Sequence, residues 1–176
     1  MRHPQHSHTG AAAPCVRRAL FLSTALATVL ALGLLLSACG SAPRYASPAP
    51  PPPGSPLGQG VVSTARSVIG TPYAYGGASP YEGFDCSGLA YWAYATQGAP
   101  IPRSSGDQLG AGRPVDPGSM QPGDLVFFDV DGSSHVGIYA GYGAFIHSPK
   151  TGGRVREEDM GKDYWRRRFV AVRRMY

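Results

Sequence analysis

The sequence predicts an α+β domain in which N-terminal helices pack on an antiparallel β-sheet. Two observations lead to this fold class. Apolar residues recur at helical spacing over residues 61–70 and again from Cys86, and short apolar segments separated by turn residues then follow from Leu125 to the end of the chain. Helical patterns therefore precede strand patterns along the chain, which is the order typical of the α+β class.

The first helix is predicted from "VVSTARSVIG", residues 61–70, because its apolar side chains form one stripe that Gly70 closes. A turn-rich loop, "TPYAYGGASPYEG", follows it. The second helix begins at Cys86, continues with a helical pattern of apolar residues and stops at Gly98, a residue type that often ends helices.

Strands are predicted from four later segments. "QPGD" is a turn that precedes "LVFFDV", residues 125–130, which is apolar on both faces and is expected to be a buried strand. "HVGIYAG", residues 135–141, and "AFIHS", residues 144–148, predict two further strands joined by a glycine-containing loop. "RFVAVRRM", residues 168–175, predicts an edge strand at the end of the chain.

The N-terminal segment has the pattern of a secretory signal. Arg17 and Arg18 precede the apolar run "ALFLSTALATVLALGLLLSAC", which is also long enough to be a plain membrane anchor. Its end, "LSACG", resembles a bacterial lipobox, in which the cysteine is acylated and becomes the new N-terminus. We therefore expect residues 1–38 to be a lipoprotein signal peptide and Cys39 to carry lipid, with the plain anchor as the alternative.

Residues 39–60 are expected to be the lipidated cysteine and a tether. The segment after Cys39 is rich in proline, alanine, serine and glycine and has almost no large apolar residues, so it cannot build a core. Residues 61–176 have the composition of one globular domain. Gly40 stands where an inner-membrane retention signal has aspartate. That resemblance indicates a lipid-anchored protein of the cell envelope, at the periplasmic face of the outer membrane if the host has one.

The charge of the chain excludes a nucleic-acid partner. The sequence has 16 Lys and Arg against 11 Asp and Glu, and the expected loss of residues 1–38 removes three of the arginines, so the net charge falls from +5 to +2. The remaining basic clusters, residues 166–168 and 173–174, are short and terminal. No basic face of the kind that binds nucleic acid is predicted.

Cys86 is the cysteine that remains as a free thiol if the leader is removed and Cys39 is acylated. Cys15 is removed with the leader and Cys39 is acylated, so Cys86 has no intramolecular disulfide partner in a compartment that oxidises thiols. It lies at the predicted start of a helix, where free N–H groups favour a thiolate, and Asp85 is placed to be the N-cap. A free thiol kept in such a compartment is either buried or needed for chemistry.

Three interpretations of Cys86 stay open from the residues alone. A nucleophilic thiol needs a base, and His135 and His147 are the histidines that follow residue 38. A buried structural cysteine would more often lie mid-helix. One cysteine and two histidines could also hold zinc, although the chain has no closely spaced pair of ligands.

Six blocks resemble one known family. "GTPYAYGG", "DCSGL", "PRSSGDQ", "PGDLVFF", "HVGIYAG" and "FIHSP" occur in the order and approximate spacing of the NlpC family of cell-wall cysteine endopeptidases, from about Val61 to the C-terminus. The chain looks closest to the Spr-type lipoprotein members, which cut stem peptides and cross-links of peptidoglycan. The resemblance implies a reduced papain-like α+β fold and a monomer that acts on peptidoglycan peptides without metal or cofactor.

The same resemblance implies a catalytic triad. It makes Cys86 the nucleophile, His135 the general base and His147 the residue that orients the base. A thiolate would attack an amide carbonyl, His135 would protonate the leaving amine, and water would release the acyl-enzyme. Two other classes stay open: a papain-like transacylase or amidase on another acyl substrate, and a non-catalytic wall-binding module.

Three further residues match motif positions of the family. Tyr73 matches a tyrosine over the nucleophile that helps to bind the oxyanion, although it could be a packed loop aromatic. Ser87 and Arg103 match positions that line the cleft, and Arg103 could equally be a solvated cap.

The strand pattern makes one geometric prediction. If His147 orients His135, both must lie on one face of the sheet, and a one-residue slip in register moves a side chain to the other face. A two-residue turn at 141–142 pairs Val136 with His147 and separates the histidines. A three-residue loop, 141–143, pairs Gly137 with His147 and brings them together, so we predict the three-residue register.

Overall fold

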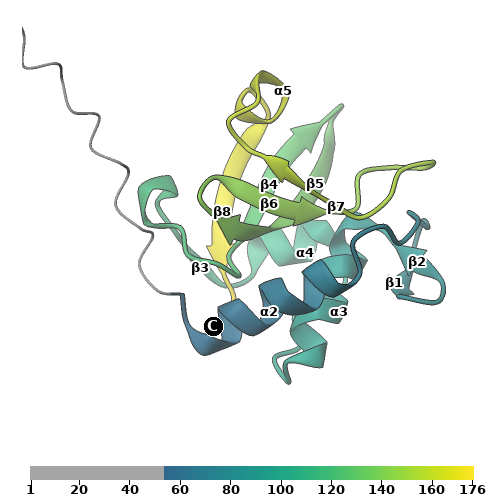
Figure 1. Ribbon diagram of the computed structural model, residues 1–176. Helices are drawn as coiled ribbons and strands as arrows, with labels where there is room; N and C mark the ends of the chain where they lie inside the picture. Colours follow the sequence, from purple (N-terminus) through teal and green to yellow (C-terminus); the bar gives the residue numbers. More distant parts are fainter. Residues whose placement is uncertain (1–53) are drawn as a thin grey trace, which may run out of the picture. The chain divides into compact units, whose positions relative to one another are not determined.

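A computed structural model of the protein describes residues 54–176 (Figure 1). The expected signal peptide, Cys39 with its expected lipid and most of the expected tether lie outside the described residues. Among the residues described, no helix is long and apolar enough to cross a membrane.

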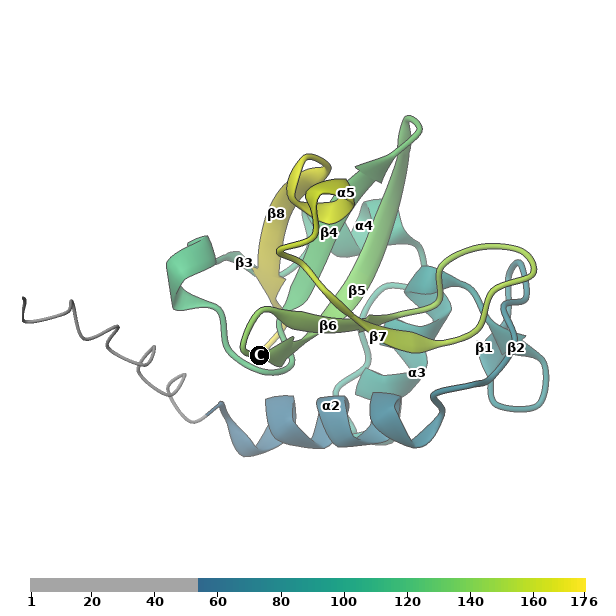
Figure 2. The same cartoon turned by 45° about the horizontal axis from the view of Figure 1, so that its top comes forward.

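The two longest helices of this part of the chain pack on one face of an antiparallel sheet, so the predicted α+β class is confirmed (Figures 1 and 2). Within residues 54–176 the main sheet has six strands, in the order β3-β8-β4-β5-β6-β7. These strands are β3 (Arg113–Pro114), β4 (Leu125–Val130), β5 (Ser133–Gly141), β6 (Ala144–His147), β7 (Arg156–Asp159) and β8 (Phe169–Arg174). A separate hairpin pairs β1 (Ala78–Ser79) with β2 (Gly83–Phe84).

The first helix, α2 (Pro56–Ser67), begins earlier than the apolar stripe predicts. The Ser55 hydroxyl accepts a hydrogen bond of 3.0 Å from the Gly58 N–H, and proline at the first helical position has no N–H that would need an acceptor. Residues 56–60, expected to belong to the tether, are therefore helical. The helix also ends at Ser67 rather than at Gly70.

The second helix, α3 (Cys86–Thr96), starts where it was predicted. The Asp85 carboxylate caps it by accepting a hydrogen bond of 2.6 Å from the Gly88 N–H, which satisfies one of the free amides of the first turn. The chain leaves the helix through Gly98, whose φ of 75° suits glycine. Cys86 is therefore held at the positive end of a capped helix.

Three short helical segments complete the described part. They are α4 (Ser105–Gly110), the 3₁₀ turn η1 (Pro117–Ser119) and α5 (Asp163–Arg166). The sequence pattern predicts none of them, because each is too short to show helical periodicity.

Two strands differ from expectation. β8 is not an edge strand, because β3 pairs with its outer side while β4 pairs with its inner side. The strand at the other edge is β7, whose sequence "REED" carries no apolar residue and so gives no strand signal. Charged residues are common on exposed edges because they discourage pairing with another chain.

The register between β5 and β6 is the predicted one, although the turn is shorter. Ile138 pairs with Ile146 and Tyr139 with Phe145, which is the register of the three-residue loop. Gly141 then pairs with Ala144, so the chain turns at residues 142–143, both with positive φ. The residue that the loop loses is taken up as a bulge between Tyr139 and Gly141, which preserves the register.

The two faces of the sheet bury different sets of side chains. One face packs on α2 and α3 and includes Phe127, Val136, Ile138 and Ile146. The other face is aromatic, and Trp165 of α5 covers Phe128 and Phe145 with ring centroids 4.9 Å and 5.1 Å apart. Ile138 and Ile146 thus point into the helical core, while the histidines lie on the aromatic side.

Gly137, which the predicted register places opposite His147, makes room for the Phe145 ring. A Cβ atom at this position would lie 2.5 Å from Cδ2 of the Phe145 ring, far inside a normal contact distance. The glycine therefore admits the phenylalanine that packs beside the histidines, rather than the imidazole of His147 itself.

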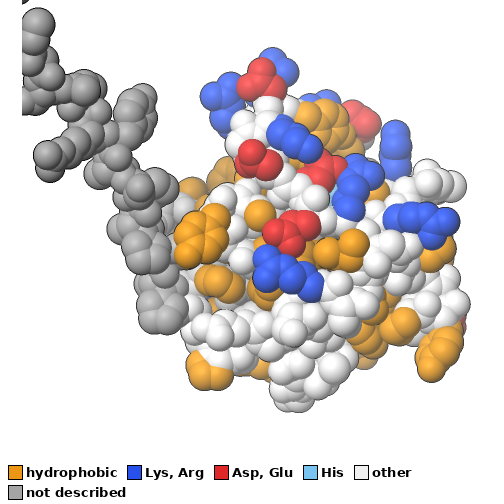
Figure 3. All heavy atoms as spheres, in the orientation of Figure 1, with side chains coloured by type: hydrophobic (Ala, Val, Ile, Leu, Met, Phe, Trp, Pro, Cys, Tyr) orange, Lys and Arg blue, Asp and Glu red, His pale blue; other side chains and the backbone are white. Residues whose placement is uncertain are grey.

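The surface over β7 and α5 carries charges of both signs, whereas the surface over α2 is mostly uncharged (Figure 3). This charged region includes Glu158, Lys162 and Asp163.

Candidate active site

An open cleft of about 720 Å³ lies between the start of α3 and the end of the sheet where β4 turns into β5. Five of the residues singled out in the sequence line it: Tyr73, Cys86, Ser87, Arg103 and His135. The loop after β6 contributes Pro149 and Lys150 to its rim. His147 does not line the cleft; it lies behind His135 and is completely buried.

Cys86 is a half-buried thiol at the base of this cleft, and no disulfide engages it in residues 54–176. Burial raises its pKa, the backbone amide of Val136 opposes this shift, and the nearby Asp85 carboxylate adds to it. The thiol is therefore protonated at rest. It needs a base beside it to become a nucleophile at neutral pH.

The imidazole rings of His135 and His147 contact each other directly. Nε2 of His135 lies 2.8 Å from Nδ1 of His147, and the two rings are nearly perpendicular. The predicted meeting of the two histidines on one sheet face is confirmed. Because Nε2 of His135 is engaged with His147, Nδ1 is the nitrogen left to serve the thiol.

Glu158, which the sequence patterns do not indicate, extends this pair. Its Oε1 lies 3.6 Å from Nε2 of His147, and no other described residue offers that buried nitrogen a hydrogen bond. The distance is slightly longer than a hydrogen bond but well within reach of a charge interaction. Its place follows from the register, since Glu158 pairs with Phe145, which lies on the same face as His147.

Three neighbours hold the Glu158 carboxylate in place. The Trp165 indole N–H donates a 2.8 Å hydrogen bond to Oε2, the Arg156 guanidinium contacts Oε1, and the Lys162 ammonium lies 3.5 Å from Oε2. Burial pulls the pKa of Glu158 upward, but the hydrogen bonds from Trp165 and Arg156 outweigh it, and the pKa falls well below its usual range. The carboxylate is ionised.

Both imidazoles are neutral at neutral pH. Burial lowers the pKa of His135 to about 4, with help from the Arg156 charge, while Glu158 opposes the shift. Burial and the neighbouring His135 lower the pKa of His147 in the same way. Each ring therefore carries one proton, and the neighbouring groups decide which nitrogen holds it.

The arrangement assigns those protons. The carboxylate of Glu158 favours a proton on Nε2 of His147, which leaves a lone pair on Nδ1. That lone pair accepts the Nε2–H of His135, so Nδ1 of His135 carries a lone pair toward the cleft. With Glu158 and His147 behind it, Nδ1 of His135 is thus available as a base in the cleft that Cys86 also lines.

Arg103 joins the walls of the cleft. Its guanidinium forms an ion pair of 2.8 Å with Asp85, donates 3.0 Å to the Ser87 hydroxyl and reaches the Gly77 carbonyl at 3.2 Å. The pKa of Asp85 is lowered: burial acts to raise it, but the hydrogen bonds from Arg103, the Gly88 N–H and Ser87, together with the Arg103 charge, outweigh that effect. Arg103 is therefore not a solvated cap. It fastens the turn before β1 to the start of α3.

Tyr73 lines the cleft, and its surroundings place it near the thiol. Burial raises its pKa, and the Cys86 and Asp85 charges add to the shift. Its N–H donates a 2.9 Å hydrogen bond to the carbonyl of Gly153, which ties it to the loop on the other side of the cleft. Its neutral hydroxyl is a hydrogen-bond donor.

Gln108, the last residue of the "PRSSGDQ" block, has a structural role that the sequence motif alone does not reveal. Its side chain is completely buried and donates to the carbonyls of Ser87 at 3.1 Å and Pro102 at 2.7 Å. It therefore anchors α4 to the first turn of α3. Within residues 54–176, no three His, Cys, Asp or Glu side chains are grouped so that they could hold a metal ion.

Comparisons with known proteins place this geometry in a family. Residues 70–174 match the model of the NlpC/P60 family. Murein DD-endopeptidase MepH of Escherichia coli is 43% identical over 113 residues, and a probable endopeptidase of Corynebacterium glutamicum is 47% identical over 96 residues. These alignments cover 61% and 54% of this chain but 42% and 45% of the relatives, so the chain spans less than half of their length.

Solved structures agree with the sequence comparison. A NlpC/P60 family protein from Bacillus cereus has a TM-score of 0.64 at 35% identity, covering 71% of this chain and 41% of that one. The peptidoglycan hydrolase RipB of Mycobacterium tuberculosis has a TM-score of 0.59 at 35% identity, covering 68% and 64%. With the family model matched across most of the sheet and α3, the chain belongs to the NlpC/P60 family.

Proposed function

We propose that this protein is a cysteine peptidase that hydrolyses amide bonds in the peptides of peptidoglycan. The observation that carries the proposal is that Cys86, at a capped helix start, lines one cleft with His135, whose Nε2 is held 2.8 Å from a second histidine. Relatives named as murein and peptidoglycan hydrolases support the substrate class. A non-catalytic binding module would need none of this proton relay.

The first chemical step makes the acyl-enzyme. The Cys86 thiol gives its proton to Nδ1 of His135, and the thiolate attacks the amide carbonyl carbon. Negative charge develops on the carbonyl oxygen. The free backbone N–H of Cys86 at the start of α3 is a natural donor to it, and the Tyr73 hydroxyl is a second.

The second step releases the amine. The C–N bond breaks as Nδ1–H of His135 protonates the leaving nitrogen, which leaves a thioester on Cys86. Water then gives a proton to Nδ1 of His135 and attacks the thioester carbon. The thiolate leaves, regains the proton from His135, and the carboxylic acid product departs.

Glu158 acts through the histidines rather than on the substrate. When His135 takes the thiol proton, the histidine pair becomes cationic in a buried setting that disfavours charge. The carboxylate of Glu158 at 3.6 Å offsets that cost and holds His147 in the tautomer that orients His135. We assign it as a positioning residue.

Digestion of purified peptidoglycan by the full-length protein tests the function. Mass spectrometry of the soluble products should show new stem peptides whose termini identify the bond that is cut. Lipid acyl donors and glutamine-type amides, offered in parallel, test the transacylase and amidase alternatives. Turnover of those substrates without release of stem peptides would contradict the proposal.

A further inference from the structure

A second hollow of about 360 Å³ adjoins the cleft on the far side of His135 from Cys86. The two share Val130, His135, Pro149 and Lys150, so they open into each other. Cys86 and the residues that surround it at the start of α3 line the cleft but do not reach the second hollow. His135 therefore stands on the boundary between them.

The position of His135 gives the two hollows different roles. A substrate amide bound over Cys86 has its acyl half on one side of the reacting carbon and its amine half on the other. The amine half must lie beside the group that protonates it, because proton transfer needs hydrogen-bond distance. The hollow that contacts His135 but not the thiol is thus on the amine side.

Lys150 lines both hollows, and the other charged side chains of each side balance one another. On the acyl side, Asp85 and Arg103 neutralise each other in an ion pair of 2.8 Å. The second hollow is lined by three cationic and two acidic side chains, and its excess of one positive charge equals the charge of Lys150 at the shared mouth. These are Lys150, Arg156, Lys162, Asp131 and Glu158.

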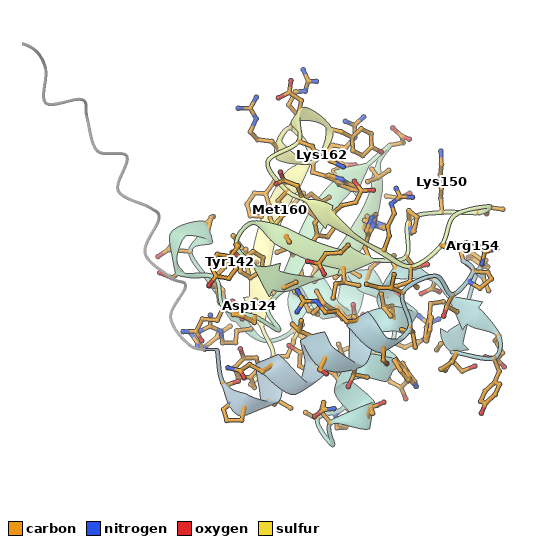
Figure 4. The ribbon with its side chains drawn as sticks, viewed as in Figure 1. Asp124, Tyr142, Lys150, Arg154, Met160 and Lys162 are labelled. Atoms are coloured by element: carbon orange, nitrogen blue, oxygen red, sulfur yellow. The ribbon has the colours of Figure 1, made fainter. Side chains whose placement is uncertain are left out.

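Lys150 is the uncommitted cation of this set. Arg156 and Lys162 both form ion pairs with Glu158. Lys150, on the loop after β6, forms no ion pair with any residue in the described range 54–176 and is exposed at the mouth shared by both hollows. Figure 4 labels Lys150 and Lys162, which come from the loops after β6 and before α5.

The floor of the hollow is apolar. Trp165 is buried beneath it, and Pro149 and the half-exposed Tyr164 form its walls. An aromatic floor with one free ammonium at the rim suits an amino-acid residue that presents aliphatic carbon to the rings and a carboxylate to the lysine.

From these contacts we propose that the second hollow is the subsite for the amine half of the scissile amide, and that Lys150 recognises a carboxylate on that half. The proposal rests on the proposed peptidase function. It assigns to the loop after β6 the choice between free-acid and amidated peptide substrates. An exposed ion pair discriminates modestly, by about three- to fivefold, because water and salt screen it.

The test uses the full-length protein and two synthetic peptides that span the bond identified by mass spectrometry. The peptides are identical except that the residue after the cut bond carries a carboxylate in one and a carboxamide in the other. The unmodified protein should have a kcat/KM about three- to fivefold higher for the acid, chiefly through KM, and added salt should erase the difference. Lys150→Met should bring the ratio of the two kcat/KM values to about one.

Arg113→Met is the matched control. Arg113 is an exposed cation on β3, at the opposite edge of the sheet from β7, so this change should keep the acid-to-amide ratio. Equal kcat/KM values for both peptides in the unmodified protein, or an unchanged ratio in Lys150→Met, would overturn the subsite while leaving the peptidase function intact. Failure to cut either peptide or peptidoglycan would instead refute the proposed function, and the subsite with it.

Discussion

Glu158 lies 3.6 Å from Nε2 of His147, on the side of the histidine pair opposite Cys86. The two residues belong to adjacent antiparallel strands, and the register places both on the aromatic face of the sheet. The carboxylate thus reaches a buried imidazole whose other nitrogen already contacts His135 at 2.8 Å. The relay extends from the sheet edge to the cleft.

Replacing Glu158 should slow the reaction and change its pH dependence. Glu158→Ala removes a charged partner of a buried histidine and should lower kcat by roughly ten- to a hundredfold, and Glu158→Gln by less, because an amide oxygen still accepts the Nε2–H. Glu158 raises the pKa of both histidines, so its loss lowers them further. A base with a lower pKa stays unprotonated in more acid, so the acidic limb of kcat/KM should move to lower pH.

Glu157→Gln is the control for that change. Glu157 is the neighbouring residue on β7 and pairs with Arg66 on the exposed surface. We expect its replacement to leave kcat and the pH profile unaltered and to cost less than about 1 kcal/mol of stability. A Glu158→Ala protein with the original pH profile would argue that the carboxylate only supports the fold.

His147 should tolerate asparagine better than alanine. The amide oxygen of an asparagine can occupy the position of Nδ1 and accept the Nε2–H of His135, whereas alanine leaves that N–H buried without a partner. His147→Ala should therefore lose about tenfold more kcat than His147→Asn. Steady-state assays of both purified variants check this, and equal activities would remove the orienting role.

The two histidines show how far sequence reasoning reaches. Strand parity alone brings His135 and His147 to one face, because a bulge near Ala140 preserves the register even though the turn differs from the expected loop. Cys86 was placed at a helix start by a local signal, the Asp85 cap. Both inferences use information that lies within a few residues of the site.

Glu158 and the start of α2 could not be found in the same way. All four residues of β7 are charged, so the strand has no alternation of polar and apolar residues, and its pairing with β6 depends on tertiary structure. The stripe of α2 begins at Val61, but the Ser55 cap and Pro56 start the helix earlier. Ser55 and Pro56 are a helix-start signal in the sequence, but they lie in a proline-rich segment whose composition predicts a tether.

Asp124, the aspartate of the "PGD" block, contributes to the stability of the fold rather than to catalysis. This fully buried carboxylate forms two hydrogen bonds with Arg174, of 2.6 Å and 2.7 Å, and accepts one of 2.8 Å from the Gln121 N–H (Figure 4). Asp124→Ala leaves the guanidinium without its partner and should lower the free energy of unfolding by about 3 kcal/mol. Denaturant unfolding measures this, and a loss below about 1 kcal/mol would contradict it.

Cys39, which lies outside the described residues, should carry lipid. The "LSACG" sequence around it supports this proposal, and with it the anchoring of the protein in the cell envelope. Labelled palmitate fed to expressing cells should mark the unmodified protein and not Cys39→Ala. An unlabelled protein found in the soluble fraction would refute the anchor.

The most direct test of the account is the release of stem peptides from peptidoglycan by Cys86→Ala. In the proposed mechanism the thiol forms the covalent bond to the acyl group, so the variant should release none above background. Its unfolding midpoint should stay close to that of the unmodified protein, because a half-buried thiol contributes little packing. Loss of activity in a folded protein is the result the account predicts. Continued release of the same peptides by the purified variant would contradict it.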